Sequence, residues 1–330
     1  MKICIVKLSA MGDIIHAMVV LQFIKNKFPK ATIDWIVEES FKGVLENNPY
    51  IDKILPVNLK SIKKNKLEII NQIKLVNNYG KNNYDIVIDA QGLIKSAIVS
   101  KIIGNRIVGS FIAGFCKNSI REKAANWFYD KKVTIAYERN VIDRNMKLIA
   151  KTLDMDISTK QIEQKEPFLY FNTKKEIDGE YIVFVVGASK ENKIYPKEKF
   201  LELSGHLNQK VIVVWGNEKE KRIAEYLKAN SELIDIAPKT NIDGLKSLIA
   251  NANLVIGGDT GPTHMAWGLN IPSITIFGNT PEDRNTYITK INRVVKSNSK
   301  VDPYKLDKND FSIQDIDTKE IYNIAKEVIS

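Results

Sequence analysis

Short apolar runs alternate with longer segments of helical periodicity along almost the whole chain. The runs at 3–6, 84–88 and 106–109 are typical of strands, and the segment at 14–28 is typical of an amphipathic helix. This alternation predicts βα units with parallel sheets. The pattern occurs twice, on either side of a polar segment at 156–175, so we expect two similar α/β domains.

The chain has 330 residues, which is enough for two domains of ordinary size. We expect a first Rossmann-like domain at 1–160, a linker at 161–175 and a second Rossmann-like domain at 176–313. For the C-terminal helix, at about 314–330, packing against the first domain is one alternative. Ligands of open α/β sheets bind beyond the carboxyl ends of the strands. We therefore expect the chemistry in the loops after the strands, with the two domains facing each other across a cleft.

The positive charge of the chain lies almost entirely in its first half. Basic residues exceed acidic ones by 11 over residues 1–165, whereas residues 166–330 carry a net charge of −1. A basic half favours an anionic partner, which is a nucleic acid, an acidic membrane surface or a phosphorylated substrate. Solvated lysines without a partner remain the alternative, although a uniform bias would not leave the second half slightly acidic.

Composition and local sequence patterns argue against several other classes of protein. Cys4 and Cys116 are too few for a disulfide framework or a four-ligand zinc site. The Asp-x-Asp triplets at 154–156 and 315–317 follow no clear buried strand, so we predict no metal site. No apolar run approaches the roughly 18 to 20 residues that cross a bilayer, and the first residues are typical of a strand and not of a signal peptide. We expect a cytoplasmic protein.

The loop after the first strand, KLSAMGDIIH at 7–16, runs from a strand into a helix and contains Asp13. A carboxylate at a helix N-terminus is held in its ionised form and can accept a proton. Aspartates in this position are also common as helix caps. The residues alone leave both interpretations of Asp13 open.

The strongest local pattern is the turn GGDTGPTH at 257–264, between a buried strand and a helix. Glycines let a phosphate approach the backbone, and the free N–H groups of a helix N-terminus bind anions. Thr260 and His264 add side-chain donors. The turn matches neither the dinucleotide fingerprint nor the Walker P-loop, so neither a dehydrogenase nor a P-loop ATPase is favoured. An ordinary glycine-rich turn is the alternative.

Two further loops follow strands of the second half. The loop at 187–196 contains Lys193, whose ammonium group can neutralise a diphosphate. Glu218 and Glu220 follow another strand and can accept hydrogen bonds from sugar hydroxyls. Each of these side chains is also compatible with an ordinary exposed position.

Basic side chains gather in two connecting segments of the first half. One follows the strand at 54–57 and the other contains Arg121 and Lys123, and such clusters can hold carboxylate or phosphate groups. No aromatic interleaving or nucleic-acid motif accompanies them, so nucleic acid is the weaker candidate partner. The lysines of the first segment are Lys60, Lys63, Lys64 and Lys66.

Four segments in this order resemble the ADP-heptose:lipopolysaccharide heptosyltransferases, glycosyltransferase family 9, and most of all the type I enzymes. They are KLSAMGD at 7–13, YDIVIDAQGL at 84–93, NKIYP at 192–196 and DTGPTH at 259–264. The similarity covers essentially the whole chain. It implies a glycosyltransferase-B fold, with an acceptor-binding first domain and a nucleotide-sugar-binding second domain.

The resemblance also implies roles for individual residues. Asp13 takes the position of the general base. On the donor side it implies contacts to ADP-heptose from Ser189, Lys193, Glu220, Asp259, Thr260, Gly261 and His264. On the acceptor side it implies Ser9, Lys60, Lys63, Lys64 and Arg121. The sequence departs from the family at two places. Ala10 replaces a common serine, and lysines replace arginines on the acceptor side. Lysine cannot form the bidentate contacts that arginine forms.

The implied reaction is an inverting transfer of L-glycero-D-manno-heptose from ADP-heptose to a Kdo residue of Kdo2-lipid A, in the inner core of lipopolysaccharide. It requires no cofactor, involves no nucleic acid, and places the protein peripherally on the cytoplasmic face of the inner membrane. Two alternatives remain. One is a type II or III enzyme of the same family that adds heptose to a later core acceptor, and the other is a non-catalytic protein that binds nucleotides or nucleic acid.

Overall fold

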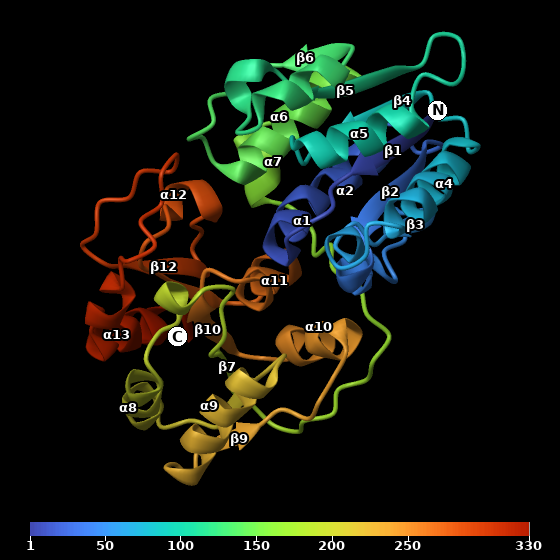
Figure 1. The fold of residues 1–330 in the computed structure, drawn as a ribbon. Coiled ribbons are helices and arrows are strands. Elements are labelled where there is room, and N and C mark those ends of the chain that lie inside the picture. The colour runs from blue at the N-terminus through green and yellow to red at the C-terminus, as the bar shows by residue number, and fades with distance from the viewer. Residues whose placement is uncertain (330) are drawn as a thin grey trace. The chain divides into compact units, whose positions relative to one another are not determined.

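The computed structural model describes residues 1–329, apart from the side chain of Lys63. It divides into two compact units, Met1–Tyr170 and Phe171–Ser330. Each unit has a six-stranded parallel sheet with helices on both faces (Figure 1). The α/β class predicted from the sequence is confirmed.

The first sheet has the strand order β3-β2-β1-β4-β5-β6. Helices α1, α2 and α6 pack together in one layer, whereas α4 lies beside α5 in the other. The strands are β1 (Lys2–Val6), β2 (Thr32–Glu38), β3 (Lys53–Val57), β4 (Ile86–Asp89), β5 (Phe111–Phe115) and β6 (Lys131–Val133). The α-helices are α1 (Met11–Met18), α2 (Val20–Lys27), α3 (Lys42–Leu45), α4 (Glu68–Gly80), α5 (Ile94–Ile103), α6 (Val141–Leu153) and α7 (Thr159–Glu163).

The second sheet has the order β12-β11-β10-β7-β8-β9, with α8 beside α9 and α10 beside α11. Its central strands are almost wholly apolar because they are buried on both faces. The strands are β7 (Ile182–Val185), β8 (Val211–Val214), β9 (Ile234–Ile236), β10 (Leu254–Gly258), β11 (Ser273–Phe277) and β12 (Asn292–Lys296). The α-helices are α8 (Lys197–Leu207), α9 (Glu218–Ala229), α10 (Ile242–Ala250), α11 (Gly261–Leu269), α12 (Glu282–Asn285) and α13 (Thr318–Ile329).

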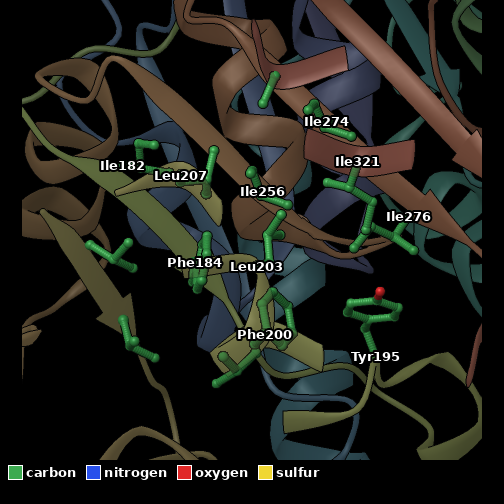
Figure 2. Close-up of a cluster of buried hydrophobic side chains, with 14 of the residues drawn as sticks. Ile182, Phe184, Tyr195, Phe200, Leu203, Leu207, Ile256, Ile274, Ile276 and Ile321 are labelled. Atoms are coloured by element: carbon green, nitrogen blue, oxygen red, sulfur yellow. The ribbon is translucent and has the colours of Figure 1, made fainter. Parts of the chain in front are cut away.

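The C-terminal helix α13 packs within the second unit. Its Ile321 belongs to the buried apolar cluster that Figure 2 shows, together with Ile274 and Ile276 of β11. The helix also lies against α8. The apolar face of the C-terminal helix is therefore used in the core of its own unit.

Three local predictions need correction. Residues 106–109 form a turn that closes with Ser110 N–H donating to the Ile107 carbonyl, and Gly109 has a φ of +83°, so the strand begins only at Phe111. The helix predicted at 14–28 is divided into α1 and α2. Strands β6 and β12 escaped prediction because they are charged edge strands without an apolar run.

Between residues 1 and 329, no helix has both the length and the apolar character needed to cross a membrane.

Candidate active site

Asp259 is the centre of a polar cluster in the second unit. It directly follows β10, and its side chain is 9% exposed. Its Oδ2 accepts a hydrogen bond from Lys193 Nζ at 2.6 Å, and its Oδ1 lies 3.0 Å from His264 Nε2. The structure therefore brings together three of the side chains that the sequence placed on the donor side.

Close packing at Gly258 positions Lys193 beside Asp259. A Cβ atom on Gly258 would lie 2.9 Å from the Lys193 carbonyl, so only glycine lets the two backbones approach this closely. Tyr195, two residues later, is buried next to Phe200 (Figure 2) and donates a hydrogen bond to the Ile316 carbonyl. The loop that carries Lys193 is thus fixed to the core of its unit.

The surroundings of Asp259 favour its ionised form. Burial alone would raise the pKa of this carboxyl group, but the hydrogen bond from His264 and the charge of Lys193 hold the pKa well below its usual range. The carboxylate is therefore negative at neutral pH. It can fix the Lys193 ammonium group and the His264 ring in place.

The N-terminus of α11 adds backbone donors to this cluster. Thr260 is the N-cap residue, and Gly261 and Pro262 open the helix. The first N–H groups of a helix have no carbonyl partner within it, and they carry the positive end of the helix dipole. The Thr260 hydroxyl lies 3.4 Å from that of Thr263. The arrangement suits an anion such as a phosphate.

Sequence reasoning missed two members of the cluster. Thr280 Oγ1 and Asn285 Nδ2 donate to Asp259 Oδ2 at 2.9 and 3.2 Å. Thr280 lies in the loop after β11, and Asn285 ends the short helix α12. The position of Thr280 after a predicted strand was a usable signal, whereas that of Asn285 was not.

Glu220 lies in the first turn of α9. Its two carboxylate oxygens accept hydrogen bonds from Gly216 N–H at 2.6 Å and from Asn217 Nδ2 at 2.7 Å. A Cβ atom on Gly187 would overlap with the Glu220 side chain, so this glycine makes room for it. Glu220 closes the N-terminus of α9, and its remaining lone pairs can still accept from a ligand hydroxyl. Ser189, in the loop after β7, is exposed.

In the first unit, Asp13 is half-buried in the first turn of α1. Its Oδ2 accepts a hydrogen bond from Ala10 N–H at 3.2 Å, and Ala10 is the N-cap residue. Asp13 therefore supports the helix start. One hydrogen bond leaves most of the acceptor capacity of the carboxylate available, so the capping interaction is compatible with a role as a base.

Hydrogen bonds to the segment after β4 hold the loop before Asp13 in place. Gln91 Oε1 accepts hydrogen bonds from Leu8 and Ser9 N–H at 3.0 and 3.1 Å. Lys7 is buried and donates to the Ala90 carbonyl at 2.9 Å. The two segments that resemble the family in this unit are thereby joined by hydrogen bonds.

Asp89 holds the segment after β4 in place. The side chain is completely buried, and its Oδ1 accepts from Gln91 and Gly92 N–H. Its Oδ2 accepts from Tyr129 and Ser96 hydroxyls at 2.7 and 2.8 Å. Burial raises the pKa of Asp89, although these hydrogen bonds act in the opposite direction. This aspartate is a structural anchor.

The basic residues proposed for the acceptor lie in loops that follow strands of the first sheet. Lys60 donates to Ser40 Oγ at 3.4 Å, and its ammonium group lies 4.6 Å from the centre of the Phe41 ring. Lys64 and Arg121 are exposed. The side chain of Lys63 lies outside the described part of the chain.

Glu38 joins the end of β2 to the first loop, and sequence reasoning did not find it. It is buried at the end of β2, and its N–H donates to the Leu8 carbonyl at 3.1 Å. Burial raises the pKa of its carboxyl group, and the charges of Lys95 and Lys60 act in the opposite direction. Glu38 therefore joins the end of β2 to the Asp13 loop through its backbone. Among residues 1–329, no group of three or more His, Cys, Asp and Glu side chains could hold a metal ion.

Comparison with known proteins assigns the chain to a family. The model of glycosyltransferase family 9 (heptosyltransferase) matches residues 72–311. The sequence is 40% identical to lipopolysaccharide heptosyltransferase 1 of Campylobacter coli, over 99% of both chains. The chain belongs to glycosyltransferase family 9.

Other members of family 9 agree in sequence and in structure. Lipopolysaccharide heptosyltransferase 1 of Escherichia coli K12 is 30% identical, over 85% of this chain and 88% of the relative. The solved structure of E. coli heptosyltransferase WaaC with ADP matches with a TM-score of 0.84 and 26% identity, over 99% of this chain and all of that one. The two Rossmann-like units are thus those of a glycosyltransferase-B fold, and the family 9 chain is a glycosyltransferase, not a non-catalytic binding module.

Proposed function

We propose that this protein transfers L-glycero-D-manno-heptose from ADP-heptose to a Kdo residue of Kdo2-lipid A, with inversion at the anomeric carbon. The step belongs to the synthesis of the inner core of lipopolysaccharide. The 40% identity to a type 1 heptosyltransferase over nearly the full length of both chains supports this acceptor over the later core acceptors. The reaction uses no cofactor in this proposal.

The observation that carries the donor side is the cluster of Asp259, Lys193 and His264 at the start of α11. Asp259 orients the two basic side chains, and the helix N-terminus supplies N–H donors next to them. These groups bind the diphosphate of ADP-heptose. They also stabilise the negative charge that develops on ADP as the bond from the anomeric carbon to the phosphate oxygen breaks.

Asp13 is the base of the reaction. It removes the proton from the acceptor hydroxyl while that oxygen forms a bond to the anomeric carbon, and ADP leaves from the opposite face. The start of α1 favours the ionised form of the carboxylate that this step needs. The hydrogen bonds from Leu8 and Ser9 N–H to Gln91 keep the loop in place.

The first unit binds the acceptor. Lys60, Lys63, Lys64 and Arg121 supply positive charge for the carboxylates and phosphates of Kdo2-lipid A, and Ser9 supplies a hydroxyl group. The acyl chains of this acceptor anchor it in a bilayer. We therefore place the protein at the cytoplasmic face of the inner membrane, bound peripherally.

The deciding experiment offers two acceptors to the purified protein together with ADP-heptose. Kdo2-lipid A is the first, and the same lipid already carrying one heptose is the second. We expect transfer to the first only, and the product should show an inverted anomeric linkage by NMR. Transfer to the second acceptor alone would move the enzyme to a later step of core synthesis, and a retained configuration would contradict the single displacement by way of Asp13.

A further inference from the structure

The first half of α4 has its polarity reversed relative to an ordinary surface helix. Ile69, Ile70 and Ile73 are exposed, while Glu68 and Gln72 occupy half-buried positions. Gln72 uses its side chain to accept a hydrogen bond from Asn58 N–H at 2.8 Å. A helix normally turns its apolar residues toward the core. The isoleucines of this helix therefore lack the environment that such side chains usually have.

The second half of the same helix shows the ordinary pattern. Val76 is buried, and Asn77 and Asn78 are exposed. The reversal is consequently local to the N-terminal turns of α4, where Leu67 precedes the isoleucines as a further exposed aliphatic side chain.

Helix α5 extends this apolar area. It lies beside α4 in one layer on the sheet (Figure 1), and its Ile94 and Ile98 are exposed as well. We call these residues the α4–α5 surface. Its members are 40 to 71% exposed, and they are Leu67, Ile69, Ile70, Ile73, Ile94 and Ile98. Single exposed aliphatic residues are common, but a group on adjacent helices indicates a binding surface.

Lysines flank the apolar residues of the α4–α5 surface in the sequence, and they indicate what binds there. Residues 58–74 contain five lysines and one glutamate. Lys66, Lys74 and Lys95 are exposed next to the apolar residues in sequence. Aliphatic side chains flanked by lysines are typical of segments that lie in the interface of an anionic bilayer. Since α4 has 13 residues, it is about 20 Å long, too short to cross a bilayer.

We propose that the α4–α5 surface docks on the surface of a bilayer that contains anionic lipid. The isoleucines enter the boundary between headgroups and acyl chains, and the lysines contact lipid phosphates. Helices α4 and α5 follow β3 and β4, so both begin near the carboxyl edge of the sheet, which also carries Asp13. Docking would bring this edge to the headgroup layer. The inference deepens the proposed function by naming the membrane contact, but it requires no acceptor in the bilayer.

The test measures binding to vesicles that lack lipopolysaccharide. Full-length protein is sedimented with vesicles of phosphatidylglycerol and phosphatidylcholine, and with vesicles of phosphatidylcholine alone. We expect binding to the anionic vesicles that decreases with added salt. Replacing Ile69, Ile70 and Ile73 together by serine should weaken this binding about a hundredfold, because each half-exposed isoleucine contributes roughly a factor of five. K74Q and K95Q should each weaken it roughly fivefold.

A matched variant replaces three exposed aliphatic residues elsewhere, Val108, Ile288 and Ile291, by serine. It should bind vesicles like the unaltered protein. Ile70→Trp should have the opposite effect and strengthen binding several-fold. A variant that fails to fold would not bind more strongly, so this result would not be explained by misfolding. Transfer to a water-soluble Kdo acceptor without acyl chains should be unchanged in all these variants, since none of the residues belongs to the proposed site.

The proposal fails if the unaltered protein does not bind anionic vesicles, or if the isoleucine triple variant and the matched variant bind equally well. It also fails if the protein is a dimer by light scattering and the isoleucine variant only separates the subunits, because a second copy then covers the surface. Vesicle binding that depends on the isoleucines, in a protein without heptosyltransferase activity, would uphold the docking surface and overturn the proposed function.

Discussion

In both sheets an aspartate comes at the end of the strand in the same topological position, next to the first strand of its unit. Asp89 ends β4, and Asp259 follows β10. Asp89 accepts hydrogen bonds from uncharged donors, and burial raises its pKa. Asp259 is similarly enclosed, but Lys193 and His264 hold its pKa well below the usual range. The fold places a carboxyl group at the same position in both sheets, and the hydrogen-bonding and charged partners of that group determine its pKa.

The loops after the first strand of each unit differ in a complementary way. After β7 the chain supplies a cation, Lys193, to the aspartate of the neighbouring strand. After β1 it supplies a second carboxylate, Asp13, while Lys7 turns inward to a backbone carbonyl. One arrangement concentrates positive groups around a fixed anion, as leaving-group binding requires. The other leaves a carboxylate available, as proton removal requires.

The largest effect is expected for Asp13→Asn. The amide still accepts the hydrogen bond from Ala10 N–H, so the helix start is preserved, but it cannot take a proton. Turnover should fall about a hundredfold or more, the usual contribution of a general base. Affinity for ADP, measured by titration calorimetry, should stay the same. Asp156→Asn, at an exposed carboxylate of the same unit, is the control. Activity of the Asp13 variant within a few-fold of the original would exclude Asp13 as the base.

The next largest effect compares Asp259→Asn with Asp89→Asn in unfolding experiments. A depressed pKa in the folded state means that ionised Asp259 stabilises the fold above its ordinary pKa of about 3.9 and loses this effect as the pH falls further. Asp259→Asn should therefore cost about 2 to 4 kcal/mol at pH 7, since it leaves Lys193 without its carboxylate, and less at acidic pH. The free energy of unfolding in urea is measured from about pH 3 to 7.

Asp89 should show the opposite trend. Its raised pKa means that its contribution to stability is complete below the ordinary pKa and decreases as the pH rises through the folded value. The cost of Asp89→Asn should consequently be greatest at acidic pH and smaller near neutrality. If the costs of the two substitutions in unfolding free energy change with pH in the same direction, the inferred difference in pKa between the two aspartates is wrong.

Buried lysines also differ between the two units. Lys193 has a carboxylate at 2.6 Å, whereas Lys165 of the first unit is 6% exposed and lies over the Phe168 ring. Burial lowers the pKa of Lys165 to about 7, with Glu166 opposing the change. The stability associated with neutral Lys165 is present above its unfolded pKa of about 10.4 and is lost as the pH falls toward 7.

Lys165→Met removes the titrating group, so the variant should become more stable relative to the unaltered protein, by about 2 kcal/mol, as the pH falls from 10 to 7. The gain should disappear as the pH approaches 10. Urea unfolding at several pH values tests both statements, and Lys160→Met, at an exposed position, should change little. A gain that is independent of pH would show that packing, and not the buried charge, is responsible.

The sequence predicted those parts of the molecule that depend on neighbouring residues. Buried parallel strands are continuous apolar runs, and the loops after them contain Asp13, Lys193 and Asp259, so both the α/β class and the candidate loops could be found. The alternating pattern also separated the chain into two halves.

Features that depend on distant contacts could not be found in this way. Thr280 and Asn285 reach Asp259 only because the chain after β11 folds back toward β10. The strand at 106–109 was misplaced because its apolar residues precede a turn at Gly109. Glu38 resembles any charged residue at a strand end until its burial and the hydrogen bond from its N–H to the Leu8 carbonyl are seen.

The smallest effect separates two roles of Glu220. As a helix cap it accepts from Gly216 N–H and Asn217 Nδ2, and Glu220→Gln keeps an acceptor oxygen for the first of these. The cost in unfolding free energy should therefore stay below about 1 kcal/mol. If Glu220 also accepts from a donor hydroxyl, the variant should raise KM for ADP-heptose about fivefold, because a charged acceptor is roughly twice as strong as a neutral one.

Glu218 provides the matched control, since it lies exposed in the same helical turn and Glu218→Gln should change neither quantity. A rise in KM for the Glu220 variant without loss of stability assigns this side chain to donor binding. Loss of stability with an unchanged KM assigns it to the helix alone, and donor recognition in the second unit then depends on the Asp259 cluster without help from α9.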